Sequence, residues 1–404
     1  MTDHSAAGRP LSSSTLLLLA ALTILLGSMF GQYDLDLPTA GRLLVAAAVA
    51  IGIAAAIVSL REVERPSIAL PVRGSWRILA GLALFHIVLA VYCIHSVSPE
   101  TIDCITFQRD AVRNLLHGVD PYGQTQANIY SPELTKKFYG PGMVVDGRVQ
   151  VGFQYPPLTL AWALPGYLLG DVRYSYVLAI VAAALLLYGI YPGGRSLGLA
   201  AFLLLNPLTY YVEDRGWTEP LVLMLAAAAL YAAVHKRWWL PLAAGLLLGS
   251  KQYNFLALPF LGYLAPPLGW RTYRKLAGYA MLVGLATALP FLLWNAKALV
   301  HDIVLFHLAQ PFRDDALSMA VPFPWMLKVG PLFVIAFVLW YIRKGPHRFA
   351  TFAAGYALAM LIFVATSKQA FCNYFFLIGN LLLLAVAAMP SISLRPQLRS
   401  KDVV

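Results

Sequence analysis

Residues 174–191 read YSYVLAIVAAALLLYGIY, without a single charged side chain. A mostly apolar run of about 18 residues or more is long enough to cross the hydrocarbon core of a bilayer as a helix. Comparable runs recur along the chain, at about 14–31, 42–60, 78–96, 157–169, 196–210, 219–235, 239–250, 254–265, 276–294, 325–342, 349–366 and 373–389. The sequence therefore predicts an all-α, polytopic integral membrane protein.

The composition of the chain agrees with this class. Its 404 residues are 59% hydrophobic and only 12% charged, whereas soluble domains are about 25% charged. The net charge of +11 would suggest a nucleic-acid partner in a soluble protein. In a membrane protein the excess of Lys and Arg is expected in the cytoplasmic loops. We therefore expect membrane lipids around the protein and no nucleic acid.

Basic residues between the apolar runs predict the orientation of the chain, because cytoplasmic loops carry most of the Lys and Arg. They form these clusters: Arg61, Arg65, Arg73 and Arg77; Arg271, Arg274 and Lys275; Arg343, Lys344 and Arg348; Arg395, Arg399 and Lys401. With all of them inside, the segments 97–155 and 295–323 and the turn Ser367–Cys372 lie on the outer face. We expect one integral domain, 1–404, with two large external loops.

Two apolar segments have irregular sequences. Residues 157–169 are bracketed by prolines, and residues 239–265 are interrupted by the polar stretch SKQYN at 250–254. Irregular backbone at membrane depth survives only against protein or a water-filled cavity. Since both termini are expected inside, we expect an even number of crossings, roughly twelve, with one of these segments dipping in from outside and returning. The sequence leaves open which one.

The segment 97–155 is far longer than the few residues that usually connect two spans. Phe107, Ala111 and Leu115 recur at helical spacing in its first part, which predicts an amphipathic helix along the membrane surface. Aromatic and proline residues follow, from PYG at 121–123 to FQYPP at 153–157. A loop of this length is typical of a functional segment.

Three motifs in this loop carry a resemblance to a known class of enzymes. They are Ile102-Asp103-Cys104-Ile105-Thr106-Phe107, then Leu115-Leu116-His117-Gly118-Val119-Asp120-Pro121-Tyr122, then Tyr155-Pro156-Pro157-Leu158. In this order and spacing the loop resembles the GT-C glycosyltransferases, and more narrowly the glycosyltransferase 87 family. The rest of the chain is similar to that family in hydropathy and layout. This chain departs from the family pattern in two ways: it has Phe107 where a Tyr is common, and two extra spans precede the loop.

The resemblance implies a GT-C-like fold in the cell membrane, with a catalytic first external loop. It implies that a hexose, with mannose expected, moves from a polyprenyl-phosphate-sugar donor to a lipid or glycan acceptor. The transfer would take place on the extracytoplasmic face, with inversion at the anomeric carbon. A transporter or flippase of lipid-linked sugars is the alternative, but it would place its ionisable residues near the bilayer midplane.

No metal ion or other cofactor is expected. The acids of the loop 97–155 lack a D-x-D spacing, and a lipid-phosphate sugar brings one phosphate rather than a pyrophosphate. Cys93, Cys104 and Cys372 lack the spacing of a zinc site or a disulfide framework. A bridge between Cys104 and Cys372 would be compatible with an oxidising outer compartment.

Asp103 is the expected catalytic base. A sugar on a lipid phosphate already has a good leaving group, so the enzyme chiefly needs a carboxylate that deprotonates the attacking hydroxyl. Asp103 follows the run 78–96 by a few residues, which places it at the membrane surface. The alternative is that Asp103 is one of several solvated loop acids.

Further side chains are expected to bind substrate: Asp110, Tyr122, Tyr155, Lys251, His307, Arg313 and Lys368. Asp110 would orient an acceptor hydroxyl, and the two tyrosines would line a sugar or prenyl groove. The four basic side chains would contact the donor phosphate. Lys251 interrupts an apolar stretch, where an ionisable residue is a functional-site hypothesis. The guanidinium of Arg313 matches the geometry of a phosphate.

Each of these assignments has a structural alternative. Asp110 is also explained as an ordinary charge on a helix face, and the tyrosines as interfacial aromatics. Lys251 is also explained as a side chain that snorkels at a span end, and His307 as a solvated loop residue. An Asx-turn explains Asp120 better than catalysis does. Glu219 is explained by the N-terminal dipole of the helix that it opens.

Overall fold

The computed structural model describes residues 13–32, 67–68, 74–96, 102–265, 269–389 and 391–392. The apolar run 42–60, the basic residues Arg61, Arg65 and Arg73, and the basic tail lie outside the described residues. The described chain is mostly helical, as the apolar runs predict, and each of its strands is only two residues long.

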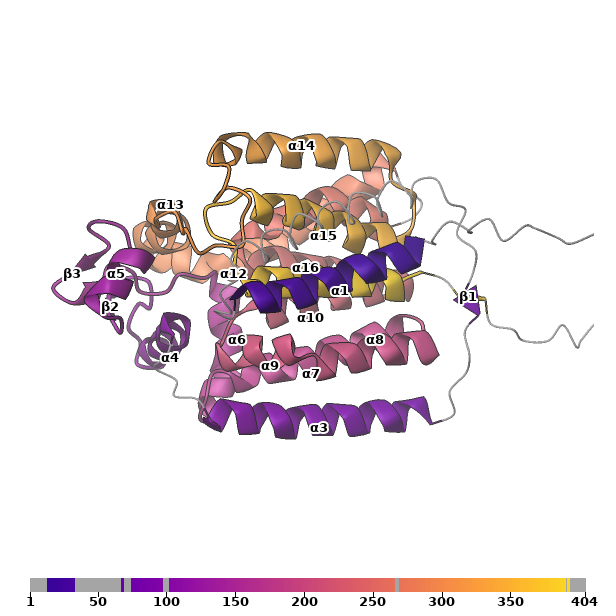
Figure 1. The fold of residues 1–404 in the computed structure, drawn as a ribbon, viewed down its shortest axis with the longest axis horizontal. Coiled ribbons are helices and arrows are strands. Elements are labelled where there is room, and N and C mark those ends of the chain that lie inside the picture. The colour runs from indigo at the N-terminus through magenta and orange to yellow at the C-terminus, as the bar shows by residue number, and fades with distance from the viewer. Residues whose placement is uncertain are drawn as a thin grey trace, which may run out of the picture.

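Most of the helices lie side by side in one bundle (Figure 1). They are α1 (Ser13–Gln32), α3 (Ser75–Ser96), α7 (Tyr174–Ile190), α8 (Gly194–Leu205), α10 (Glu219–Val234), α14 (Met326–Lys344), α15 (Phe349–Ala365) and α16 (Cys372–Ala387). α10, α15 and α16 are apolar on nearly all sides, and such a helix is stable only where apolar groups surround it. Their side chains are buried almost throughout and form the centre of the bundle.

Three described helical segments are long and apolar enough to cross a membrane. They are α3, α14 and Trp270–Ala309, which contains α12 (Trp270–Val300), η3 (His301–Leu305) and α13 (Phe306–Ala309). Most of their side chains face away from the protein, as lipid contact requires. α9 (Pro207–Asp214) and α10, bent by 119°, would together make a fourth. These helices support a multi-pass membrane protein, and the expected number of crossings stays a prediction.

The polar stretch at 250–254 breaks its apolar segment into two short helices, as the sequence predicts. α11 (Leu240–Ser250) and the 3₁₀ helix η2 (Gln252–Leu264) flank Lys251, whose backbone is extended, with φ −153° and ψ 149°. Irregular backbone of this kind needs protein or a water-filled cavity around it. Lys251 meets this condition, because it lies in the wall of a cavity.

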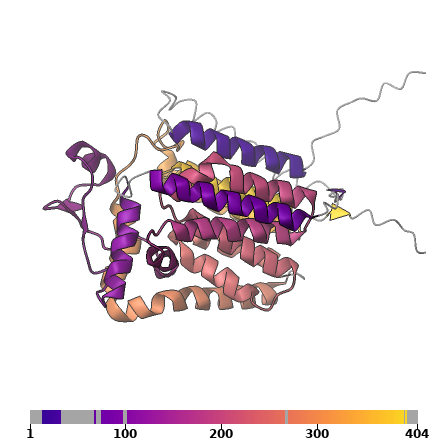
Figure 2. The ribbon, with the colours of Figure 1, turned by 90° about the horizontal axis from the view of Figure 1, so that it is seen from below.

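The other irregular segment forms α6 (Pro157–Leu168), which runs across the end of the bundle (Figures 1 and 2). Tyr155, just before α6, lines the cavity at this end. Arg173, just after α6, donates to the Oδ1 atom of Asp214 at 3.3 Å, next to the cavity residue Arg215. α6 therefore starts and finishes at the same end of the bundle. Which of the two irregular segments dips into the membrane and returns stays a prediction.

Residues 102–156 form a cap on this end of the bundle (Figure 1). The cap contains α4 (Asp103–Leu116), α5 (Pro132–Phe138) and an antiparallel sheet in the order β2 (Gln126–Ala127), β4 (Arg148–Val149), β3 (Val144–Val145). The segment after α12 is tied to it, because Oδ2 of Asp302 accepts hydrogen bonds from the backbone N–H groups of Gly152 and Phe153 at 2.8 and 3.0 Å. The segments 97–155 and 295–323, which are predicted to lie on the same face, are therefore in contact.

The predicted amphipathic helix is present as α4, but its apolar face does not lie on a membrane surface. Phe107 and Ala111 are fully buried in the protein. α4 crosses the end of the bundle and packs against α6 (Figure 2). The prediction of its surroundings was wrong because protein covers this face: Ala111 packs with Leu160 and Ala163 of α6, and Phe107 packs with Tyr139 and Val149 of the cap.

The opposite end of the bundle carries the described basic residues of the predicted inner clusters. Arg77 lies in the first turn of α3, and Arg343 and Lys344 lie in the last turn of α14. β1 (Ser67–Ile68) pairs in parallel with β5 (Ser391–Ile392) at the same end (Figure 1). The predicted outer and inner segments therefore separate to opposite ends, and which end faces the cytoplasm stays a prediction.

Candidate active site

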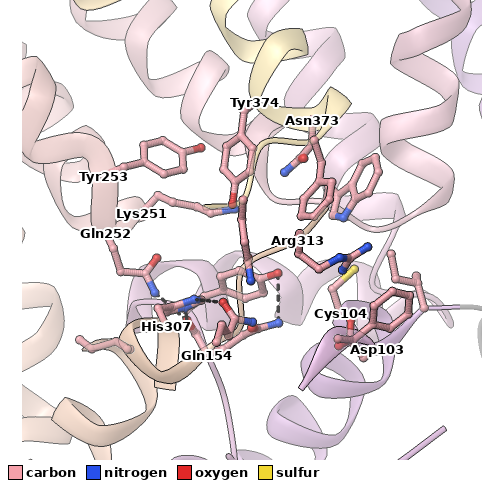
Figure 3. Close-up of a pocket in the computed structure, with 18 of the residues that line it drawn as sticks. Asp103, Cys104, Gln154, Lys251, Gln252, Tyr253, His307, Arg313, Asn373 and Tyr374 are labelled. Atoms are coloured by element: carbon pink, nitrogen blue, oxygen red, sulfur yellow. Dashed lines mark hydrogen bonds between the residues drawn. The ribbon is translucent and has the colours of Figure 1, made fainter. Parts of the chain in front are cut away.

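A cavity of about 720 Å³ opens at the capped end of the bundle (Figure 3). Its wall combines the start of α4, the segment before α6, the break between α11 and η2, the region of α13 and the start of α16. Five of the predicted site residues line it: Asp103, Tyr155, Lys251, His307 and Arg313. Asp110, Tyr122 and Lys368 do not belong to this wall.

Asp103 is the first residue of α4 and is half-buried in the cavity wall. Its Oδ2 atom accepts a hydrogen bond from the Tyr139 hydroxyl at 2.6 Å, and its backbone N–H donates to the Tyr130 hydroxyl at 3.1 Å. Burial raises the pKa of Asp103 above its ordinary value, although the Tyr139 hydrogen bond and the charge of Arg313 oppose the rise. A raised pKa makes a carboxylate a more effective general base at neutral pH.

Lys251 is only 6% exposed and does not snorkel out of the protein. Its Nζ atom donates to Oε1 of Glu219 at 2.8 Å and to the hydroxyl of Thr218. The same ammonium lies 4.7 Å from the ring centroid of Tyr155, within the range of a cation–π interaction. The break in the helix therefore presents a fixed cation to the cavity.

Glu219 has a larger role than the helix dipole alone explains. Its side chain is fully buried, and Oε1 accepts hydrogen bonds from both Lys251 and the Tyr253 hydroxyl, the latter at 3.0 Å. A buried charge is tolerated when it is paired in this way. The sequence contained a signal only for Lys251, which interrupts an apolar stretch, whereas Glu219 stands at the start of one.

His307 and Arg313 line the cavity from the segment that follows α12. Nε2 of His307 donates to the Gln154 carbonyl at 2.9 Å. Arg313 donates two hydrogen bonds to the carboxylate of Asp315, both at 2.7 Å. The guanidinium is also packed between two aromatic rings, 4.3 Å from the centroid of Phe138 and 4.8 Å from that of Phe371. Neither residue is merely solvated.

Asp110 and Lys368 do not themselves line the cavity. Asp110 forms an ion pair with Arg113 at 3.0 Å along α4, which is the helix-face arrangement given as its alternative. Nζ of Lys368 donates to the backbone carbonyls of Leu308, at 2.8 Å, and Gln310. Lys368 therefore ties the turn before α16 to the segment after α12.

Tyr122 and Asp120 hold the loop in place behind the cavity. Tyr122 is 2% exposed, and its hydroxyl donates to the carbonyl of the cavity residue Tyr155 at 2.9 Å. Oδ1 of Asp120 accepts from the Tyr122 backbone N–H at 3.0 Å, which is the predicted Asx-turn. Oδ2 of Asp120 accepts from Nδ2 of Asn295 at 2.8 Å, at the kink in α12.

Several lining residues carried no signal in the sequence. Tyr130, Tyr139 and Gln154 are ordinary aromatic and amide residues in their local context, and so is Asn373 near the start of α16. Their importance comes from position, since Tyr139 contacts Asp103 and the Gln154 carbonyl accepts from His307. Only the fold brings these separate segments together.

Within the described ranges, no three His, Cys, Asp or Glu side chains lie close enough together to hold a metal ion. The expectation of a metal-independent reaction stays a prediction. The cysteines at 93, 104 and 372 are free thiols. Sγ of Cys104 donates to the Arg215 carbonyl at 2.9 Å, so the structure contains no bridge between Cys104 and Cys372.

Comparisons with known proteins complete the description of the site. No protein-family model and no curated protein matches this chain. Among solved structures, the chain is similar to the crystal structure of ArnT from Cupriavidus metallidurans bound to undecaprenyl phosphate, with a TM-score of 0.49 and 19% sequence identity. The match covers 78% of this chain, and the chain spans 60% of the length of that ArnT chain.

Proposed function

We propose that this chain is a membrane glycosyltransferase that moves a hexose from a polyprenyl-phosphate-sugar donor to a lipid or glycan acceptor on the outer face of the membrane, with mannose as the expected sugar. One observation carries the proposal. Asp103, from the first loop motif, lines the same cavity as the buried cation Lys251, at one end of an apolar helix bundle. A base and a phosphate partner at a membrane boundary are what such a transfer requires.

Asp103 would act as the general base. As the acceptor oxygen attacks the anomeric carbon, its proton passes to the Asp103 carboxylate, and the bond between that carbon and the phosphate oxygen breaks. The polyprenyl phosphate leaves with the bonding electron pair, and the single displacement inverts the anomeric carbon. Tyr139, which donates to Oδ2, holds the carboxylate in place and supports this role.

Lys251 and Arg313 would stabilise the phosphate that leaves. Two donors of the Lys251 ammonium go to Thr218 and Glu219, and an ammonium has a third. The two rings around Arg313 fix its guanidinium at the wall. His307 would help to position the wall through Gln154. Lys368 and Tyr122 would support the wall from behind, and we assign Asp110 no role in holding the phosphate.

The apolar side of the cavity would receive the prenyl chain. Phe255, Val304 and Leu308 line the cavity and are at the same time 58%, 43% and 71% exposed on the protein surface. An apolar rim that faces lipid lets a long prenyl chain stay in the bilayer while its phosphate lies among the polar residues. This arrangement fits a lipid-linked donor better than a nucleotide sugar.

A transporter of lipid-linked sugars accounts less well for the arrangement. Transporters place their coupling and substrate sites near the bilayer midplane, between discontinuous spans. Here Asp103, Lys251 and Arg313 lie at one end of the bundle (Figure 3). The position of these charges favours chemistry at the membrane boundary.

The test is a transfer assay with the purified full chain in lipid nanodiscs. Radiolabelled polyprenyl-phosphate-mannose, and matched donors that carry other hexoses, are incubated with the protein and a cell-envelope lipid extract. Movement of label from donor to a new lipid or glycan supports the proposal. Transport of labelled donor across proteoliposomes without any new product would overturn it in favour of the transporter.

A further inference from the structure

Residues 152–155 form a short strap whose last two residues line the cavity. The whole strap is buried, and it passes so close to the turn at Pro121 that a Cβ on Gly152 would overlap the Pro121 carbonyl. The ring centroid of Tyr155 lies 4.7 Å from the Lys251 ammonium. The cation–π contact at Lys251 therefore depends on where the strap holds the Tyr155 ring.

Asp302 holds the start of the strap from a distant segment of the chain. Its Oδ2 atom accepts from the backbone N–H groups of Gly152 and Phe153 at 2.8 and 3.0 Å, and its Oδ1 atom accepts from Nδ1 of His301 at 2.8 Å. Asp302 is 1% exposed and belongs to the π-helical turn η3, a rare geometry that is frequent at functional sites. A carboxylate has only acceptor sites, and here three donors meet them.

Asp302 does not itself line the cavity, so any effect on a substrate has to pass through its neighbours. Without its carboxylate, two buried backbone N–H groups would lose their acceptor, which is unfavourable, and the strap would shift until they reach water. Such a shift would take the Tyr155 ring away from the Lys251 ammonium. Asp103 would keep its place, because α4 and the Tyr139 hydroxyl hold it.

The contact between Tyr155 and Lys251 matters for the donor. The ring, together with the carboxylate of Glu219, restricts the ammonium to one position, and a cation that is already ordered loses less entropy when it binds a phosphate. Building on the proposed function, we infer that Asp302 is a positioning residue that fixes Tyr155 against Lys251 and so sets the affinity for the donor phosphate.

A double-mutant cycle tests this role. The full chain in nanodiscs is prepared as the wild type, Asp302→Ala, Tyr155→Leu and the double variant. Each protein is assayed for kcat and KM with the polyprenyl-phosphate sugar that the wild type transfers, and for the binding of radiolabelled polyprenyl phosphate. His301→Ala is the matched control, because it removes the third donor to Asp302 and keeps both bonds to the strap.

Asp302→Ala should raise the donor KM and the dissociation constant of polyprenyl phosphate about 10-fold, while kcat and the acceptor KM stay within about twofold. In the Tyr155→Leu background, the same substitution should change both constants by less than about twofold, since the contact with Lys251 is already absent. His301→Ala should leave both constants unchanged. Asp302→Asn, which keeps one of the two side-chain oxygens, completes the cycle with a smaller rise if Asp302→Ala does not fold.

An equal rise in both backgrounds would overturn the inference, because Asp302 would then stabilise the protein without acting through Tyr155. A fall in kcat with an unchanged donor KM would overturn it as well. A wild type that transfers no sugar from any polyprenyl-phosphate donor would instead overturn the proposed function, and the binding of polyprenyl phosphate would still decide the role of Asp302. The two failures are therefore distinguishable.

Discussion

The side chain of Asp103 decides whether the cavity contains a base. Asp103→Asn keeps the shape of the residue and removes its basicity, so turnover should fall by at least about 100-fold while expression and melting temperature stay close to those of the wild type. Asp120→Asn is the control, since Asp120 holds the turn and Asn295 rather than the cavity wall. It should lower the melting temperature more than the turnover. Near-normal turnover in Asp103→Asn would remove the base from the mechanism.

The pH dependence of turnover reports on the same carboxylate. Burial raises the pKa of Asp103, and the deprotonated form is the active one, so activity should be lost as the pH falls through a pKa above that of an ordinary Asp. Tyr139→Phe removes a hydrogen bond that lowers this pKa, which should move the acidic limb of kcat/KM to still higher pH. Tyr92→Phe, at an exposed position on α3, is the control. An acidic limb that stays in place in Tyr139→Phe would mean that another group titrates.

At the scale of elements, the position of Lys251 depends on how closely α11 packs against α12. A Cβ on Gly245 would lie 2.4 Å from Cβ of Val283 and 2.7 Å from the Ala280 carbonyl, so only glycine fits there. Close approach through small residues is a common way for membrane helices to pack. Because α11 ends at Ser250, directly before Lys251, a change in this packing would reach the cavity.

Gly245→Ala should therefore lower the melting temperature of the purified protein, since overpacking costs about 1–3 kcal/mol. Gly278→Ala is the matched control on α12, where nothing lies within 4 Å of an added Cβ. It should be neutral or slightly stabilising, because Ala favours a helix over Gly by roughly 0.8–1 kcal/mol. Equal melting temperatures for the two variants would contradict the close packing of α11 and α12.

At the scale of the whole molecule, the orientation in the membrane fixes which compartment the cavity opens to. Val145 is exposed in the cap, and Lys344 is exposed at the opposite end of the bundle. If the cap is outside, Val145→Cys should react with a membrane-impermeant thiol reagent in intact cells, and Lys344→Cys only after permeabilisation. The three native cysteines are replaced first, because Cys93 is partly exposed and Cys104 lines the cavity. The reverse pattern would put the cavity on the cytoplasmic face.

The local properties of the sequence were enough to predict a large part of this molecule. The apolar runs predicted the helices, and the polar stretch at 250–254 predicted the break at Lys251. The positions of the basic clusters predicted that the loops around Asp103 and Arg313 lie on the same side. The hydropathy of a segment, and the charge of the loops on either side of it, can be calculated without knowing its contacts in the folded protein. This suffices for a membrane helix because each span must form its own backbone hydrogen bonds in lipid.

What the tertiary structure decided depends on contacts between distant segments. Packing against α6 and against the rest of the cap covered the apolar face of α4, which its periodicity alone assigned to a membrane surface. The fold also separated Lys251 and Arg313, whose side chains line the cavity, from Lys368, whose ammonium binds the backbone carbonyls of the lining residues Leu308 and Gln310. From the sequence, these three basic side chains could be compared as phosphate ligands only by residue type. Whether a side chain reaches a cavity is set by the packing of helices far apart in the chain, and no local pattern records that packing.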